Sequence, residues 1–283
     1  MTALRLAGAP ISWGVCEVPG WGHQLDADRV LDEMVAVGIT AAEFGPDGFL
    51  APGALARHGL AAVGGFVPVV LHDPSADAEA QVARQISSFA AAGAEMLVLA
   101  AATGADGYDS RPDLDDVAWK TLLSNLDRLA EVAAAGGLRA VLHPHVGTMI
   151  ENRDDVWRVL DGSSIPLCLD TGHLLIGGSD PVELATQAAD RIAHAHLKDV
   201  DLAQLGRVTA GELSYSAAVA EGLYRPLGAG DVDIAAVVSH LRGAGYDGWW
   251  VLEQDTVLDG EPAGDGPVAD VRASIEYLHT LVS

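Results

Sequence analysis

The chain has 283 residues, 49% of them hydrophobic, and a formal net charge of −24 from 40 acidic and 16 basic residues. This length suits one large α/β domain or two small ones, and so acidic a surface repels phosphate backbones, which makes nucleic acid a poor partner. No apolar run approaches the roughly 18 residues of a membrane span. The first five residues lack the layout of a signal peptide, so we expect a cytoplasmic protein.

Short apolar runs alternate with helix-forming segments from one end of the chain to the other. The runs predict eight buried strands, at residues 4–8 (continuing irregularly through 11–13), 39–44, 62–71, 96–100, 139–142, 166–169, 192–197 and 249–252. We expect helices at residues 27–37, 53–58, 76–92, 114–135, 153–160, 181–189, 234–242 and 267–282.

Eight strands, each followed by a helix, predict an α/β fold of the (β/α)8 TIM-barrel type, as a single domain over residues 1–283. A doubly wound open sheet is the alternative. That fold normally carries a glycine-rich phosphate loop after its first strand, and residues 9–14 do not form one.

Polar clusters follow four of the predicted strands: His143-Pro144-His145, Asp170-Thr171-Gly172-His173, His194-Ala195-His196-Leu197-Lys198-Asp199 and Glu253-Gln254-Asp255. In a barrel, the carboxyl ends of the strands converge on one pocket. We therefore expect the side chains of His143, Asp170, His196 and Glu253 to reach one ion. Two imidazoles and two carboxylates suit a divalent ion such as Mn²⁺, Co²⁺, Zn²⁺ or Fe²⁺, with Mg²⁺ as a further candidate.

Residues near these ligands are candidates for catalysis. His145, His173 and Lys198 are expected to transfer protons, and Asp199 is expected to hold a substrate oxygen. For Lys198, a salt bridge to Glu43 or Asp199 at the barrel rim stays open as an alternative.

The remaining candidates would bind substrate. Glu43 ends the second predicted strand at the same rim, and Trp13 and Phe44 would form an apolar wall, with core packing as the alternative. The long connection over residues 200–230 is expected to fold over the pocket as a lid. Its candidates for touching substrate or a neighbouring subunit are Tyr215, Tyr224 and Arg225.

On these motifs the chain resembles the xylose isomerase-like TIM-barrel superfamily of sugar isomerases, epimerases and dehydratases, and within it looks most like the inosose dehydratases. The segments that carry the resemblance are residues 11–15, 19–22, 43–48, 143–148, 170–173, 196–199, 226–228 and 249–255. It implies a divalent metal, Mn²⁺ or Co²⁺ first, at Asp170, His196 and Glu253. His143 stands where many members have a glutamate.

The resemblance also implies a reaction, the loss of water from 2-keto-myo-inositol through an enediolate to give a trihydroxycyclohexane-dione. His145 would remove the proton next to the ketone, and His173 or Lys198 would assist the departing hydroxyl. A metal-dependent keto-sugar isomerase or epimerase is the alternative, and a homodimer or homotetramer is plausible for the family. An apurinic-site endonuclease of the same fold is disfavoured by the net charge of −24.

Overall fold

The computed structural model describes residues 4–282. Residues 1–3, which belong to the N-terminal segment used for the signal-peptide prediction, lie outside the described residues. Within this range, nine parallel strands form one sheet in the order β3-β2-β1-β11-β8-β7-β6-β5-β4. Their bounds are β1 Arg5–Gly8, β2 Ala41–Ala42, β3 Ala61–Ala62, β4 Phe66–Val69, β5 Met96–Ala101, β6 Arg139–Leu142, β7 Leu167–Asp170, β8 Ile192–Leu197 and β11 Trp249–Leu252. A separate antiparallel pair joins β9 Asp199–Val200 to β10 Tyr224–Arg225.

The first and last strands of this sheet, β3 and β4, follow each other directly in one segment of the chain. This segment closes the sheet into a barrel. β3 pairs with β2, and β4 pairs with β5. Between them, the Val63 amide donates to the Ala42 carbonyl at 3.0 Å and the Val63 carbonyl accepts from the Met96 amide at 2.9 Å. A Cβ on the next residue, Gly64, would lie 2.3 Å from the Met96 carbonyl oxygen, so only glycine passes this closely. The predicted TIM barrel is confirmed. The prediction of one unbroken strand over 62–71 was wrong, because the segment pairs with β2 before Gly64 and with β5 after it.

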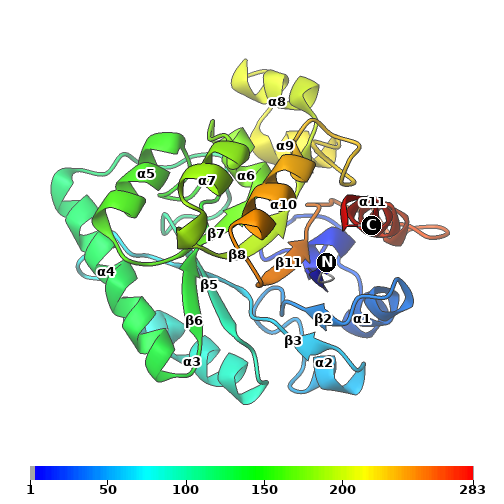
Figure 1. Cartoon of the computed structure of the whole chain (residues 1–283), viewed down its shortest axis with the longest axis horizontal. Helices are drawn as coiled ribbons and strands as arrows, with labels where there is room; N and C mark the ends of the chain where they lie inside the picture. The colour runs from blue at the N-terminus through cyan, green and yellow to red at the C-terminus, as the bar shows by residue number, and fades with distance from the viewer. Residues whose placement is uncertain (1–3, 283) are drawn as a thin grey trace.

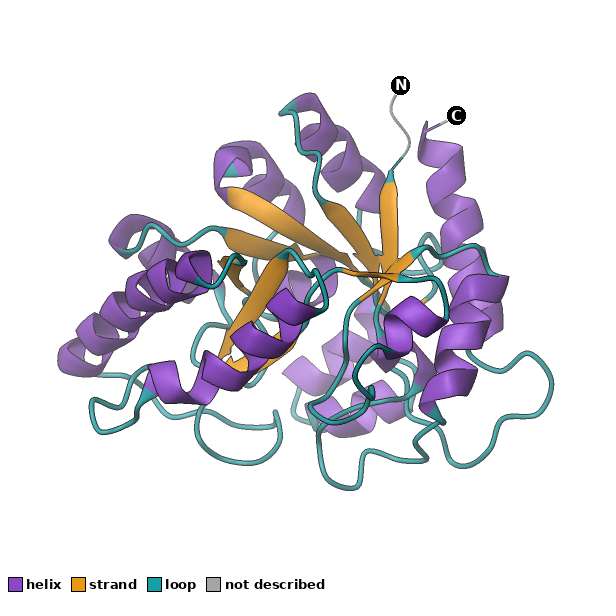
Figure 2. Ribbon diagram, turned by 90° about the horizontal axis from the view of Figure 1, so that it is seen from below, coloured by secondary structure: helices purple, strands orange, loops and turns teal. Residues whose placement is uncertain are grey.

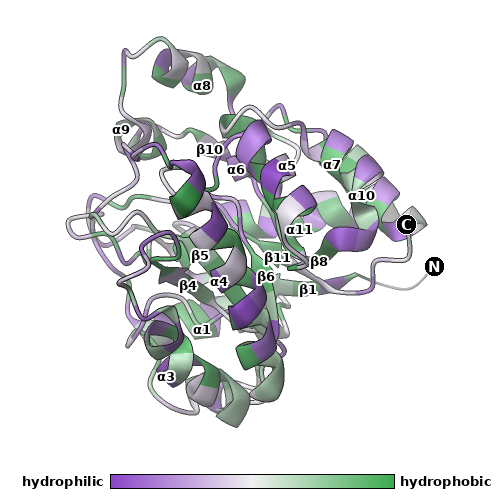
Figure 3. Ribbon diagram, turned by 90° about the vertical axis from the view of Figure 1, so that its left-hand side faces the viewer, coloured by the Kyte–Doolittle hydropathy of each residue, from purple (hydrophilic) through white to green (hydrophobic). Residues whose placement is uncertain are grey.

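Helices surround the barrel (Figure 1). Their bounds are α1 Ala27–Ala36, α2 Ala54–Arg57, α3 Ala78–Ala91, α4 Asp116–Ala135, α5 Arg153–Gly162, α6 Thr171–Ile176, α7 Pro181–Gln187, α8 Leu202–Thr209, α9 Tyr215–Ala220, α10 Ile234–Gly243 and α11 Val268–Val282, with 3-10 turns η1 at Pro10–Trp13 and η2 at Ala189–Arg191. Figure 3 shows strands in hydrophobic colours and helices such as α4 with mixed faces, as expected where one helix face packs on the sheet. Along residues 4–282, none of the helices is long and apolar enough to cross a bilayer.

Several of the acidic residues start helices. The carboxylates of Asp26, Asp77, Asp115, Asp180 and Asp233 each accept a backbone amide in the first turn of the helix that follows. Such N-caps stabilise a helix by about 1 kcal/mol each. Part of the negative charge is therefore structural.

The strands at 139–142, 192–197 and 249–252 match their predictions to the residue. The expected continuation of the first strand over 11–13 was wrong, because Pro10 starts a 3-10 turn there instead. The second strand is reduced to Ala41–Ala42. The sequence did not predict α6, nor α8 and α9 within the 200–230 connection.

Both described ends of the chain lie at one end of the barrel, opposite the long loops (Figure 2). Because the strands run parallel, their carboxyl ends all meet at the end with the loops. The polar clusters are therefore carried to one place.

Candidate active site

Three adjacent strands carry the centre of the site. Asp170 ends β7 and pairs with His196 of β8, while His196 in turn pairs with Val251 of β11. Glu253 follows β11 directly. One ligand atom from each of Asp170, His196 and Glu253 can lie within 4.8 Å of the others. The strand register therefore brings together three residues of which the first and last, Asp170 and Glu253, lie 83 positions apart in the sequence.

In the segment Asp170-Thr171-Gly172-His173, the first three residues each have a separate structural role. Asp170 Oδ1 accepts the amides of Gly172 at 2.9 Å and His173 at 2.8 Å, which starts α6 and leaves Oδ2 for the site. Thr171 Oγ1 donates to the Lys198 carbonyl at 2.7 Å and accepts from its amide at 2.8 Å. A Cβ on Gly172 would lie 2.9 Å from the Lys198 Cβ, so glycine leaves room for the lysine. Thr171 and Gly172 therefore fix the end of β7 against Lys198, which follows β8.

The Asp170, His196 and Glu253 group suits a divalent cation. His196 Nδ1 lies 3.2 Å from Glu253 Oε2 and 3.7 Å from Asp170 Oδ2, yet it is buried without a hydrogen-bond partner. Burial disfavours the imidazolium, but the neighbouring Glu253 and Glu43 carboxylates raise the pKa of His196 well above its usual value. The carboxylates around His196 therefore favour positive charge here, and its Nδ1 has no hydrogen-bond partner. Both features fit a metal ion held by two carboxylates and an imidazole.

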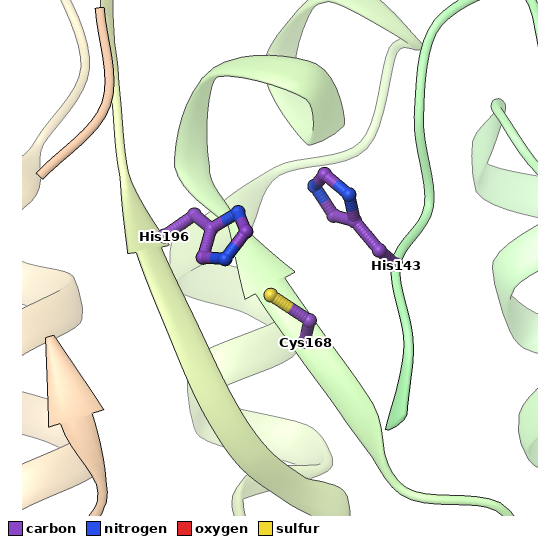
Figure 4. Close-up of side chains that lie close together, drawn as sticks. All are labelled: His143, Cys168 and His196. Atoms are coloured by element: carbon purple, nitrogen blue, oxygen red, sulfur yellow. The ribbon is translucent and has the colours of Figure 1, made fainter. Parts of the chain in front are cut away.

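His143, Cys168 and His196 meet at the floor of this group (Figure 4). The His143 and His196 rings lie 4.8 Å apart, and His143 Nε2 lies 3.3 Å from Asp170 Oδ2. Burial raises the pKa of the Cys168 thiol to about 11, so it stays protonated. His143 does not belong to the group that contains both carboxylates, and it contacts Asp170 from the side.

Glu43 holds two buried histidines. Its Oε1 accepts from His194 Nε2 at 2.8 Å and from His196 Nε2 at 3.1 Å. Burial alone would raise the pKa of this carboxyl, but His196 and His194 lower it overall. Because His196 Nε2 donates to Glu43, the lone pair of the neutral ring belongs to Nδ1, which faces the two carboxylates. Glu43 therefore orients the imidazole.

Lys198 neutralises part of the site. Its Nζ lies 2.7 Å from Asp255 Oδ1, 3.0 Å from Glu253 Oε2 and 2.9 Å from His173 Nε2. The predicted alternative partners of this lysine, Glu43 and Asp199, are replaced by other carboxylates. Burial opposes the charge, yet Asp170, Asp255 and Glu253 raise the pKa of Lys198 well above its usual value. The side chain is thus a cation at neutral pH.

His145 is kept neutral. Its Nδ1 lies 2.7 Å from the Val146 carbonyl, so this nitrogen carries the hydrogen and Nε2 carries the lone pair. Burial, helped by His143 and Lys198, lowers the pKa of His145 to about 3. Its ring lies 3.7 Å from the His173 ring. His145 can therefore accept a proton at Nε2.

The 200–230 connection reaches into the site through two tyrosines. Tyr224 Oη lies 3.3 Å from His173 Nδ1 and 2.9 Å from Tyr215 Oη, and Tyr215 donates to Asp255 Oδ2 at 3.2 Å. Burial lowers the pKa of His173 well below its usual value and raises those of both tyrosines. Lys198 and these hydroxyls thus surround a neutral His173.

A cavity of about 290 Å³ opens beside these groups. Its polar end is lined by His143, His145, Lys198, Glu253 and Asp255, while Asp170 and His196 are buried behind that end. Burial raises the pKa of Asp255 to about 6 despite Lys198. The other end is lined by Phe44, Phe66 and Phe89. The cavity joins the titratable cluster to an aromatic wall.

Three predicted substrate-binding residues lie elsewhere. Trp13 is fully buried in the core and donates from Nε1 to Glu33 at 2.8 Å. The Asp199 carboxylate accepts the backbone amides of Val200, Gly228, Gly230 and Val232, and Arg225 pairs with Asp201 at 2.8 Å. Trp13 thus takes the core position that was its stated alternative, the fold already uses the carboxylate of Asp199 and the guanidinium of Arg225, and a substrate role for these two stays a prediction.

Two residues, His194 and Asp255, belong to the polar clusters found in the sequence, but no function was predicted for either. His194 has the same strand parity as His196, which was a usable signal for a second inward-facing imidazole. Asp255 lies two residues after Glu253 in a loop, where no periodicity indicates direction. Only the folded chain shows that it contacts Lys198.

Comparisons with known proteins agree with this geometry. A family model described as the xylose isomerase-like TIM barrel matches residues 19–281. An inosose dehydratase of Geobacillus kaustophilus (strain HTA426) is 31% identical over 297 residues, covering 98% of this chain and 94% of that protein. Among solved structures, an L-ribulose 3-epimerase aligns with a TM-score of 0.70 at 16% identity, covering 99% of this chain and 95% of the other. The IolI protein with a bound zinc atom aligns with a TM-score of 0.68 at 13% identity, covering 98% of each chain. The two structures share the fold.

Proposed function

The chain belongs to the xylose isomerase-like TIM barrel family, and from that premise we propose that it is a metal-dependent hydro-lyase that removes water from a keto-cyclitol of the 2-keto-myo-inositol type. One observation carries the proposal. A neutral imidazole with a free Nε2, that of His145, lines the same cavity as Glu253, next to the buried Asp170 and His196. An acidic C–H beside a ketone needs such a base.

We propose that Asp170, His196 and Glu253 hold a divalent metal, with His143 contacting Asp170 Oδ2 from the side. Three carboxylates, those of Asp170, Glu253 and Asp255, surround a single lysine here, and an added dication offsets the excess negative charge. When bound, the ion supplies Lewis-acid polarisation of the substrate ketone. Of the candidate metals, Mn²⁺ and Co²⁺ suit this mixture of oxygen and nitrogen ligands.

The side chains divide the proton transfers between them. His145 Nε2 removes the proton next to the ketone, because its pKa of about 3 keeps it unprotonated at neutral pH. Lys198 is a cation whose Nζ lies 2.9 Å from His173 Nε2, so this contact holds the ammonium in place to donate a proton to the departing hydroxyl, and the proton taken up by His145 balances the one that Lys198 gives up. The Tyr215 and Tyr224 hydroxyls complete the chain of hydrogen bonds to Asp255.

We further propose that the whole chain is one catalytic domain, since the first and last strands pair over four residues, Arg5 with Trp249 through Gly8 with Leu252. A cytoplasmic location agrees with Cys16 and Cys168 being free thiols. A homodimer or homotetramer stays a prediction from the family.

Mass spectrometry of 2-keto-myo-inositol incubated with purified protein tests the function. With Mn²⁺ or Co²⁺ we expect a product lighter by one water, and with EDTA we expect none. An isomer of unchanged mass would instead make the protein an isomerase or epimerase. Unchanged substrate under all metal conditions would refute the proposal.

A further inference from the structure

One buried side-chain oxygen in the cavity is not used by the fold. Gln85 lies on α3, and its Oε1 is buried without a hydrogen-bond partner within residues 4–282. A buried carbonyl oxygen left unpaired costs free energy, so it marks a place where a bound molecule can supply the missing donor. Gln85 lines the same cavity as His145, Lys198 and Glu253. The unpaired oxygen therefore faces the space that a substrate would fill.

Other polar side chains around this cavity are held by the fold or open to water. They are Glu17, Asp47, Gln81, Ser88 and Tyr108. The Tyr108 hydroxyl donates to the Glu17 carboxylate, and Arg84 pairs with Asp47. Gln81 Oε1 accepts the Val70 amide at 3.2 Å, and Ser88 is exposed. Gln85 Oε1 differs from these groups because it is both buried and unpaired.

The position of Gln85 on α3 places it at the aromatic end of the cavity. Phe89 follows Gln85 by one helical turn, so both side chains lie on the same face of α3. Phe89 stacks on Phe44 with ring centroids 4.6 Å apart, and the Phe66 ring lies 5.4 Å from that of His145. An aromatic surface therefore lies between the imidazole that acts as the base and the unpaired oxygen of Gln85.

This arrangement fits the two kinds of surface that a cyclitol ring presents. The faces of the ring carry C–H bonds, which are apolar and pack well on aromatic side chains. The hydroxyls project from the edge of the ring, and each one carries a hydrogen that needs an acceptor when it is buried. A ring that lies with one face against the phenylalanines can thus direct an edge hydroxyl to Gln85.

We propose that Gln85 is a specificity-determining residue, whose side-chain carbonyl accepts a hydrogen bond from the hydroxyl on the ring carbon opposite the ketone. This inference rests on the proposed function and names a residue that recognises its substrate. The ketone and the carbons that react occupy the polar end, beside His145 and Lys198. The opposite carbon then points to the aromatic end, where its hydroxyl gives Gln85 Oε1 the donor that it lacks.

The test compares kcat/KM of the metal-loaded enzyme for 2-keto-myo-inositol and for the analogue that lacks this one hydroxyl. We expect the wild type to prefer the hydroxylated ketone by about tenfold or more, because the analogue leaves the buried oxygen unpaired. In Gln85→Leu the preference should fall towards 1, whereas Gln85→Glu keeps an acceptor oxygen and should keep a preference. Gln187→Leu is the matched control, because this exposed glutamine of α7 does not line the cavity.

Water loss from both ketones with equal kcat/KM in the wild type, or with the wild-type preference in Gln85→Leu, would overturn the inference while the proposed function stands. If neither ketone loses water, the proposed function fails, and calorimetric titration with the same two ketones decides the role of Gln85 separately. Tighter binding of the hydroxylated ketone, lost in Gln85→Leu, would support the inference. Equal affinity for the two ketones in the wild type would overturn it.

Discussion

Replacement of Glu43 is expected to weaken metal binding although this side chain is not among the proposed ligands. Glu43 accepts hydrogen bonds from His194 and His196 and so aims His196 Nδ1 at Asp170 and Glu253. Loss of such an outer partner lowers metal affinity by about 10- to 100-fold. That range corresponds to about 1.4–2.8 kcal/mol of binding free energy.

Glu43→Ala also leaves two buried imidazole N–H groups without an acceptor, since His194 and His196 are at most 1% exposed. Each unsatisfied donor costs about 1–3 kcal/mol, so we expect the free energy of unfolding to fall by about 2–6 kcal/mol. Glu43→Gln keeps one carbonyl oxygen at this position and should show a smaller loss in both quantities.

The assay is competition for Mn²⁺ against a fluorescent chelator, with urea unfolding of the metal-free variants in parallel. Glu33→Gln is a matched control, because Glu33 also accepts from a buried aromatic N–H, that of Trp13, but lies on α1 away from the site. Wild-type Mn²⁺ affinity in folded Glu43→Ala would refute the orienting role.

Four further predictions concern the site and the barrel. His145→Ala should lower kcat by about 10²- to 10⁴-fold with Mn²⁺ affinity unchanged in the competition assay; near wild-type turnover would exclude His145 as the base. Because His145 has a pKa of about 3 when folded and 6.5 ordinarily, only the unfolded chain binds its proton between these values. Urea unfolding should therefore show stability falling as pH falls from 6.5 towards 3, less steeply in His145→Gln. Lys198→Met leaves buried carboxylates unpaired and should cost about 3–5 kcal/mol, less at pH 5 than at pH 8 because the carboxyls can protonate; equal losses would contradict this. Gly64→Ala should cost about 3 kcal/mol or more, since its Cβ would meet the Met96 carbonyl at 2.3 Å, whereas Gly93→Ala, with nothing within 4 Å, should cost only ~1–2 kcal/mol.

Much of the barrel could be predicted from the chain alone. Strands at 139–142, 192–197 and 249–252 are recognisable because fully buried parallel strands are short apolar runs bounded by polar residues. The break of the third strand was not predictable, since it depends on the approach of Gly64 to Met96 across the sheet. The helices α8 and α9 lie within the connection over residues 200–230, for which the sequence predicts a lid and no helices.

The same division applies to the site. Asp170, His196 and Glu253 were predictable because a parallel barrel brings all strand ends to one face, whatever the side chains between them. Whether a polar group near that face is free for chemistry depends on which backbone amides or charges reach it first. Asp199 is taken by four amides and Arg225 by Asp201, whereas His145 keeps one nitrogen free. The sequence by itself determined which residue types gather at the barrel mouth. Only the tertiary structure decided their roles, because hydrogen bonds between distant segments choose among groups that local spacing cannot distinguish.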